Sequence, residues 1–206
     1  MALTNYTELQ TSIADWLNRS DLSAVIPDFI RFVEIDLNRS LRVRQMVSRT
    51  RAVVNAQFYK LPIDFLELRN IEIVGDPVIP LRLLTSIRAD ERRRALSGRG
   101  RPVYYSIFQD NLEFVPIPSG DTTIEILYYK NIPALSATNA TNWLLTKYPD
   151  LYLYGSLLQS APYLNDDSLY QVYGQKYASI LEAIKNDNDR ARHSGATLEI
   201  PFNTFG

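Results

Sequence analysis

Cysteine is absent from this 206-residue sequence, and histidine occurs once, as His193. A chain without cysteine has neither a disulfide framework nor thiolate ligands for zinc. A single imidazole is too few for a nitrogen-ligated metal centre, and a Ser-His-Asp triad would have to use His193, which lies in a polar stretch near the C-terminus. The composition therefore argues against metal centres and hydrolytic triads, and we expect no cofactor.

Long hydrophobic runs and a secretion signal are also missing. The start, MALTNYTELQ, has no basic flank followed by an apolar run, and the longest uncharged stretches, residues 131–146 and 151–165, are shorter than a membrane span. With 46% apolar residues, the chain is long enough for one domain or two small ones. We expect a soluble protein, and the absence of cysteine fits a reducing compartment or a virus assembled in the cytoplasm as well as any other location.

Charge is unevenly spread, although the formal net charge is only -1. Residues 39–51 and 82–101 hold 12 of the 22 bases and 2 acids, a net of +10, so the rest of the chain carries 10 bases and 21 acids, a net of -11. Such a separation favours assembly with copies of the same chain or with a charged partner.

Two amphipathic helices are predicted in the first 40 residues. Asn5 and Glu8 have the spacing of a reciprocal cap, ahead of a helix over residues 6–18. Pro27 suits the first turn of a second helix, which continues to about residue 40. Each helix has one apolar face, so we expect the two to pack as a hairpin.

The middle of the chain, residues 45–137, is predicted to be a β-rich, mostly antiparallel region with one helix. Alternating β-branched and aromatic residues indicate strands, and Thr85 starts a helix that Gly98 and Gly100 end. After Pro102, residues 103–108, 112–117 and 122–130 are predicted to form a three-stranded meander.

The helical period returns near the C-terminus. Residues 148–164 place apolar side chains on almost every face, so we expect a helix that is covered on several sides, with a neighbouring subunit as a candidate cover. Asp166 or Asp167 caps a last helix. Its apolar stripe consists of Leu169, Val172, Tyr173, Tyr177, Ile180 and Ile184.

The tail, residues 194–206, has the pattern of an extended segment. Leu198, Ile200 and Phe202 alternate, Pro201 discourages helix, and Phe205 adds a large apolar ring. We expect the tail to pair with the sheet edge of a partner. The alternative is a last strand folded back on the chain's own sheet.

Six arginines cluster around the predicted central helix: Arg88, Arg92, Arg93, Arg94, Arg99 and Arg101. Three interpretations stay open, namely a solvated or internally paired face, an interface with another subunit or partner, and a nucleic-acid site. In the third, Tyr104 and Tyr105 stack on bases. A second basic segment would contribute Arg39, Arg42, Arg44, Arg49 and Arg51.

Readout of duplex sequence is a poor interpretation. The second helix, IPDFIRFVEIDL, lacks the polar side chains that a recognition helix needs, and the pI is about 5.9. Carboxylate pairs at Asp166-Asp167 and Asp187/Asp189 suit a helix cap and a solvated helix end better than acid-base catalysis. We expect no enzyme, and a glycan hydrolase remains an alternative without a motif.

Four stretches together resemble the head-to-tail adaptor (connector) proteins of tailed bacteriophages. They begin YTELQTSIADW, LTSIRADERRR, LEFVPIPSGD and YLYGSLLQ, and they span nearly the whole chain in the family's order. The resemblance implies a helical bundle built from residues 1–44 and 138–193, with a β-rich insertion at residues 45–137 and an extended tail.

The resemblance also implies a structural virion protein of the phage neck. Such a protein forms a homo-oligomeric, twelve-membered ring beneath the portal, extends the channel for genomic DNA and offers a platform for the next tail or nozzle protein. Carried over to this sequence, Leu198, Ile200, Phe202 and Phe205 would contact the portal. The arginines from Arg88 to Arg101 would then lie at a subunit or partner interface, and a nucleic-acid-binding phage accessory protein is the alternative.

Overall fold

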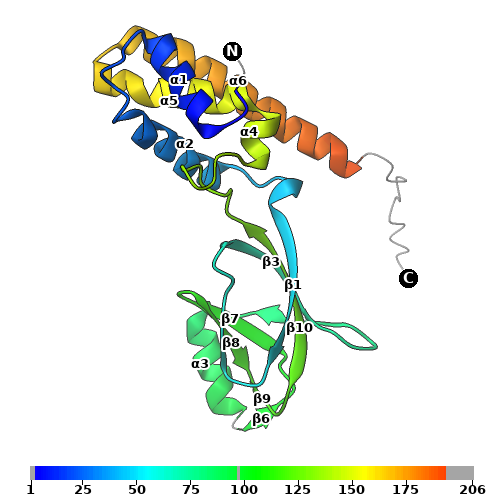
Figure 1. The fold of residues 1–206 in the computed structure, drawn as a ribbon. Helices are drawn as coiled ribbons and strands as arrows, with labels where there is room; N and C mark the ends of the chain where they lie inside the picture. The colour runs from blue at the N-terminus through cyan, green and yellow to red at the C-terminus, as the bar shows by residue number, and fades with distance from the viewer. Residues whose placement is uncertain (1–2, 97, 194–206) are drawn as a thin grey trace. The chain divides into compact units, whose positions relative to one another are not determined.

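The structure, a computed structural model, describes residues 3–96 and 98–193 (Figure 1). The chain divides into two compact units. One unit combines Met1–Arg44 with Ile132–Gly206 and is helical, and the other, Gln45–Asn131, contains the strands and one helix. The predicted α+β class is confirmed. The tail residues Leu198, Ile200, Phe202 and Phe205 lie outside the described residues.

The helical unit is arranged around one central helix. Its elements are α1 (Tyr6–Leu17), α2 (Ile26–Ser40), α4 (Trp143–Lys147), α5 (Pro149–Leu164) and α6 (Asp167–His193). Helix α5 packs against each of the other four. Only three of its residues, Asp150, Pro162 and Tyr163, are exposed, so the chain itself covers α5. The expectation that a neighbouring subunit covers this helix is wrong, because residues from both ends of the chain enclose it.

Helix ends follow local rules that the sequence reveals. Asn5 Oδ1 accepts a hydrogen bond from Glu8 N at 2.9 Å, but the Glu8 carboxylate returns to Thr4 N, at 2.8 Å, rather than to Asn5. Asp166 Oδ1 accepts from Leu169 N at 3.1 Å and thereby caps α6.

The apolar stripe predicted for α6 is confirmed only in part. Val172 is 55% exposed and does not belong to the buried face, whereas Tyr173, Tyr177 and Ile184 are buried.

The second unit consists mainly of two packed sheets. The sheet that we call the β1 sheet has the order β1-β10-β3-β4 and is antiparallel throughout. The β8 sheet has the order β2-β8-β7-β5, in which only β5 runs parallel to its neighbour. The strands of the first sheet are β1 (Val47–Val54), β3 (Phe65–Ile73), β4 (Ile79–Pro80) and β10 (Thr122–Lys130). Those of the second are β2 (Phe58–Lys60), β5 (Arg82–Leu83), β7 (Tyr104–Phe108) and β8 (Asn111–Val115).

Three shorter elements accompany the sheets. The 3-10 helix η1 (Arg44–Met46) begins at Arg44, the last residue of the first segment of the helical unit, and β6 (Arg99–Gly100) and β9 (Ile117–Pro118) form a parallel pair. The predicted three-stranded meander is wrong. Strands β7 and β8 form a hairpin, but β10 leaves them and lies between β1 and β3 in the other sheet. Alternation along β10 decides which side chains face the core, and it does not decide which strand lies beside it.

The core of this unit lies between the two sheets. The β1 sheet contributes Ile71, Ile73, Ile124 and Ile126, and the β8 sheet contributes Leu112 and Phe114 among others. The alternate residue Glu113 therefore points to the outer face of the β8 sheet. Helix α3 (Ser86–Ala95) packs against β7 and β8 on that face, as Figure 1 shows.

Candidate interaction surface around helix α3

Helix α3 carries four of the six clustered arginines, and a small residue allows it to pack closely on the sheet. Ala89 is fully buried, as is Ser106 on β7, which is the register partner of Glu113 on β8. The small side chains at these positions allow the helix to approach the sheet closely. Arg93, four residues and about one turn after Ala89, consequently lies on the same side of the helix, above Glu113.

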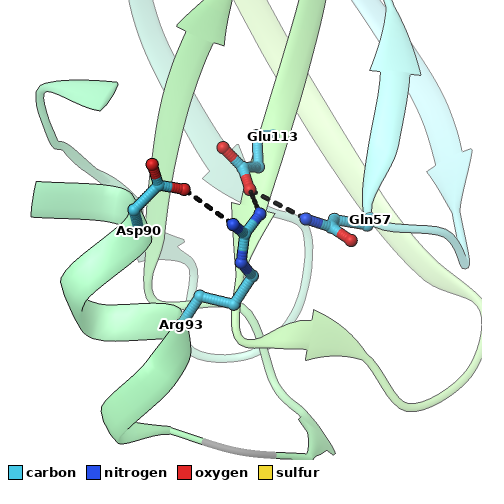
Figure 2. Close-up of polar contacts among 4 residues, drawn as sticks. All are labelled: Gln57, Asp90, Arg93 and Glu113. Carbon is cyan, nitrogen blue, oxygen red and sulfur yellow. Dashed lines mark hydrogen bonds and ion pairs between the residues drawn. The ribbon is translucent and has the colours of Figure 1, made fainter. Parts of the chain in front are cut away.

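Arg93 is held by two carboxylates (Figure 2). Its Nη1 donates to Glu113 Oε1 at 2.7 Å, and its Nη2 donates to Asp90 Oδ1 at 2.7 Å. Gln57 Nε2 donates to the same Glu113 oxygen at 2.8 Å. Because the Glu113 side chain is only 8% exposed, the guanidinium compensates an otherwise unpaired buried charge. Arg93 thus has a structural role within the chain.

The other five arginines of the cluster have a different environment. The Arg92 guanidinium lies over the Tyr104 ring, 5.7 Å from its centroid. Arg88, Arg94, Arg99 and Arg101 are exposed, and no ion pair joins them to another described residue. We call these five residues the free arginines because none of them forms an ion pair with another described residue, although Arg92 contacts the Tyr104 ring. They give this part of the surface an excess of positive charge that the described residues do not neutralise.

Large apolar side chains are exposed in the same stretch of sequence. Leu83, Ile87, Leu96 and Val103 are each between 41% and 74% exposed. A hollow beside the helix is lined by Phe58, Ser86, Asp90, Arg93, Phe108 and Glu113. Both of its phenylalanines are about half exposed, at 51% and 54%. Arginine together with exposed aromatic and aliphatic side chains is the composition that protein interfaces favour.

The features that favoured a nucleic-acid site are weaker in the structure than in the sequence. Tyr105 is buried, 7% exposed, in the core between the sheets, so it cannot stack on bases. Tyr104 remains partly accessible, although Arg92 lies over its ring. The prediction that bases stack on both tyrosines is therefore wrong, because the alternation of β7 turns Tyr105 inward.

The second basic segment is largely used within the chain. Arg49 and Arg51 both pair with Glu125 on β10, at 3.0 Å and 2.8 Å, and the Glu125 side chain is only 6% exposed. Arg42 Nη1 donates to Leu41 O at 2.6 Å and to the carbonyl of Asn38 at 2.8 Å, at the C-terminus of α2. These contacts hold three of the five side chains within the chain, and the single Glu125 carboxylate compensates one of the two charges of Arg49 and Arg51.

Sequence reasoning missed the buried carboxylates. Glu34, Glu113 and Glu125 are each at most 6% exposed. Glu34 Oε1 accepts from Leu135 N at 2.7 Å and from the Tyr152 hydroxyl at 3.2 Å, and burial raises the pKa of this carboxyl. For Glu125 a signal was available, since Arg49 and Arg51 share one face of a strand. Glu34 had none, because its partners lie more than 100 residues away in sequence.

Within residues 3–96 and 98–193, no group of three or more His, Asp or Glu side chains could hold a metal ion. Asp166 is used as the cap of α6. In the same part of the chain, every helix is too short or too polar to cross a membrane.

Comparison with known families identifies the family of this chain. The family model described as SU10 adaptor protein matches residues 4–199. The chain belongs to this family of phage head-to-tail adaptors. The match covers both units of the adaptor and ends inside its tail, after Leu198 and before Ile200. Among curated proteins, none matches the adaptor.

Membership makes the adaptor a structural protein of a tailed bacteriophage, located in the neck of the virion, where portal and tail proteins are its partners. The free arginines and the exposed apolar side chains around α3 lie in the same stretch of sequence.

Proposed function

We propose that this adaptor forms a twelve-membered ring beneath the portal, extends the DNA channel and provides the platform on which the next tail or nozzle protein binds. The observation that carries the proposal is the family match over residues 4–199. The adaptor acts without catalysis, and it surrounds the genome without reading its sequence. The free arginines and the apolar side chains around α3 form part of its interface with a neighbouring subunit or partner.

The tail is the proposed contact with the portal. Leu198, Ile200, Phe202 and Phe205 would insert against it in extended conformation. Burial of four such side chains yields roughly 6 to 12 kcal/mol at about 1.5 to 3 kcal/mol each, and ordering eight residues costs about as much. One tail is marginal, so tight attachment requires many tails around a ring.

Size measurement with and without the portal tests the ring. We expect purified adaptor to be monomeric or loosely associated, and to form a ring when the portal of the same phage is added. Light scattering after gel filtration and negative-stain imaging report both states. An adaptor that remains monomeric with the portal, and that does not bind it, would contradict the proposed function.

Deletion of residues 196–206 tests the tail separately. The truncated adaptor should fold, as judged by circular dichroism, and should pellet with the portal much less than the full chain does. Substitution of Glu199 by Gln within the full chain is the matched control and should leave attachment intact. Unchanged attachment of the truncated adaptor would remove the portal role from the tail.

A nucleic-acid-binding accessory protein is the second candidate, and the free arginines are the observation that favours it. Phosphate contacts by these residues require an affinity for DNA that falls steeply with salt. Arg94→Ala and Arg99→Ala should each reduce the salt slope, whereas Arg93→Ala should act through stability. Weak binding that these substitutions do not change would exclude this role.

A further inference from the structure

Aromatic rings form a connected and partly exposed surface on the helical unit. The ring of Trp16 on α1 contacts that of Tyr154 on α5, with centroids 5.7 Å apart, and Tyr154 contacts Tyr173 on α6 at 6.4 Å. Tyr170 lies about one turn before Tyr173 on the same helix. Trp16 and Tyr170 are 51% and 52% exposed. We call these four residues the aromatic surface, and the helices that carry it pack together, with α5 against both α1 and α6 (Figure 1).

This surface lies in an acidic part of the helical unit. Residues 3–17 and 149–175, which include α1, α5 and the first turns of α6, hold five acids and no base. Arg19, just after α1, does not offset them, because it pairs with Asp21 at 2.7 Å. Asp15, next to Trp16, is exposed, and no ion pair joins it to another described residue. A partner for this surface therefore needs positive charge and groups that pack on aromatic rings.

The surface around α3 has the opposite charge. Residues 82–101 hold seven bases and two acids, and Glu113, which pairs with Arg93, reduces the net charge from +5 to +4. On α3, Ile87 and Arg94 are seven residues and about two turns apart, so they share one face, which points away from the sheet. Ile87 is 74% exposed, so this face offers an apolar side chain and a guanidinium together. We call Ile87 and the free arginines the α3 surface.

The two surfaces are complementary in chemistry as well as in charge. The flat guanidinium of arginine stacks on aromatic rings and also donates to carboxylates. Trp, Tyr and Arg are the residues that dominate the binding energy of protein interfaces. A contact between two aromatic surfaces, or between two α3 surfaces, would instead bring like charges together.

We propose that the aromatic surface of one copy of this chain binds the α3 surface of a second copy. The two surfaces belong to different units of the chain, so the contact joins unlike patches and can repeat from copy to copy. Such a contact closes into a ring when the rotation between copies allows it. The inference rests on the proposed function and adds to it the two surfaces that meet.

Cysteine cross-linking can test this contact cleanly because the chain has no cysteine. Gln171→Cys, beside Tyr170, and Ala95→Cys, beside Arg94, replace exposed, uncharged side chains, so both surfaces keep their rings and charges. A chain that carries both changes, assembled on the portal and treated with a flexible bismaleimide, should give a ladder of adaptor oligomers on a denaturing gel. Each single variant should stay monomeric. A mixture of the two single variants should give adaptor dimers and nothing larger, because each copy then carries one thiol.

Asn186→Cys combined with Ala95→Cys is the matched control. Asn186 is an exposed amide on α6, like Gln171, but it lies 15 residues further along the helix, which is about 22 Å. This pair should give no ladder. A cross-link inside one copy would change the mobility of the monomer and would give no dimers in the mixture of single variants.

Truncation of Trp16 tests the contribution of the rings. Trp16→Ala should weaken assembly on the portal by about tenfold or more, because large aromatic side chains of this kind dominate interface energies. Phe32→Ala on α2 is the matched control, since Phe32 is 52% exposed but belongs to neither surface. It should assemble like wild type, and circular dichroism checks that both variants fold.

The outcomes separate the inference from the proposed function. Rings without a ladder from the Gln171 and Ala95 positions, or rings of Trp16→Ala that form as readily as those of wild type, would overturn the inference and leave the function standing. Cross-links inside the monomer alone, or dimers of the Gln171→Cys variant alone, would overturn it as well. If the wild-type chain does not assemble on the portal, the ring and this contact both fail.

Discussion

Gly155 lies at the closest approach of three helices, and its substitution by alanine tests how tightly the helical unit is packed. A Cβ atom at this position of α5 would lie 2.9 Å from Val33 Cγ1 on α2 and 3.0 Å from Tyr177 Cε2 on α6. Both distances are well below a normal van der Waals contact between carbon atoms. Glycine therefore lets α2 and α6 pack against the backbone of α5.

The two neighbours have little freedom to move away. Val33 is 1% exposed, and a valine in a helix has essentially one rotamer. The Tyr177 hydroxyl donates to Asp36 Oδ2 on α2 at 2.7 Å, which holds the ring in place. Overpacking of this kind costs about 1 to 3 kcal/mol, and alanine regains about 1 kcal/mol of helix propensity. We expect Gly155→Ala to lower the free energy of unfolding by up to about 2 kcal/mol.

Tryptophan fluorescence reports on this unit alone, because the two tryptophans, Trp16 and Trp143, both lie in it. Urea denaturation should show a lower midpoint for Gly155→Ala. Gly174→Ala in α6 is the matched control. Its Cβ would lie 3.6 Å from Leu158 Cδ1, an ordinary contact, so this variant should be as stable as wild type or up to about 1 kcal/mol more stable. If Gly155→Ala proved as stable as Gly174→Ala, the packing argument would be refuted.

Three further predictions concern single polar residues. Burial raises the pKa of Glu34 above its ordinary value of 4.5, so wild type should lose stability relative to Glu34→Gln as the pH rises from that value through the raised pKa. Urea midpoints measured across that range check this, and a pH-independent difference would contradict it. Arg93→Ala should cost about 1 to 3 kcal/mol because Glu113 loses its partner, whereas Arg94→Ala should cost less than about 0.5 kcal/mol, both measured by circular dichroism. Asp166→Ala should cost about 1 kcal/mol through loss of the α6 cap, and calorimetry that detects no change would show that the cap contributes nothing.

Local patterns predicted most elements because their causes are local. The apolar period located α1, α2, α5 and α6, and alternation located most of the strands. Helix α4 was missed because its five residues are too few for a period, although Asn142 before it was a usable signal. Its Oδ1 accepts from Leu144 N and Leu145 N and thereby starts the helix.

Long-range pairing was the part that the sequence did not determine. Strand β10 was assigned to the wrong neighbours, because alternation is the same whichever strand lies beside it. The cover of α5 was misjudged for the same kind of reason. An apolar helix must be enclosed, but its sequence does not say whether its own chain or another one encloses it.

The arginines show how structure narrows a functional interpretation that charge alone leaves broad. Arg49, Arg51 and Arg93 are bound to buried carboxylates, so their charges compensate groups within the chain. In the proposed function a partner would be met by the free arginines, which lie in the same stretch of sequence as exposed apolar side chains. With Tyr105 turned into the core, bases have fewer rings to stack on, so the proposal favours an acidic protein surface as the complement. Reversing the charge of a free arginine should therefore disturb assembly while leaving the fold intact.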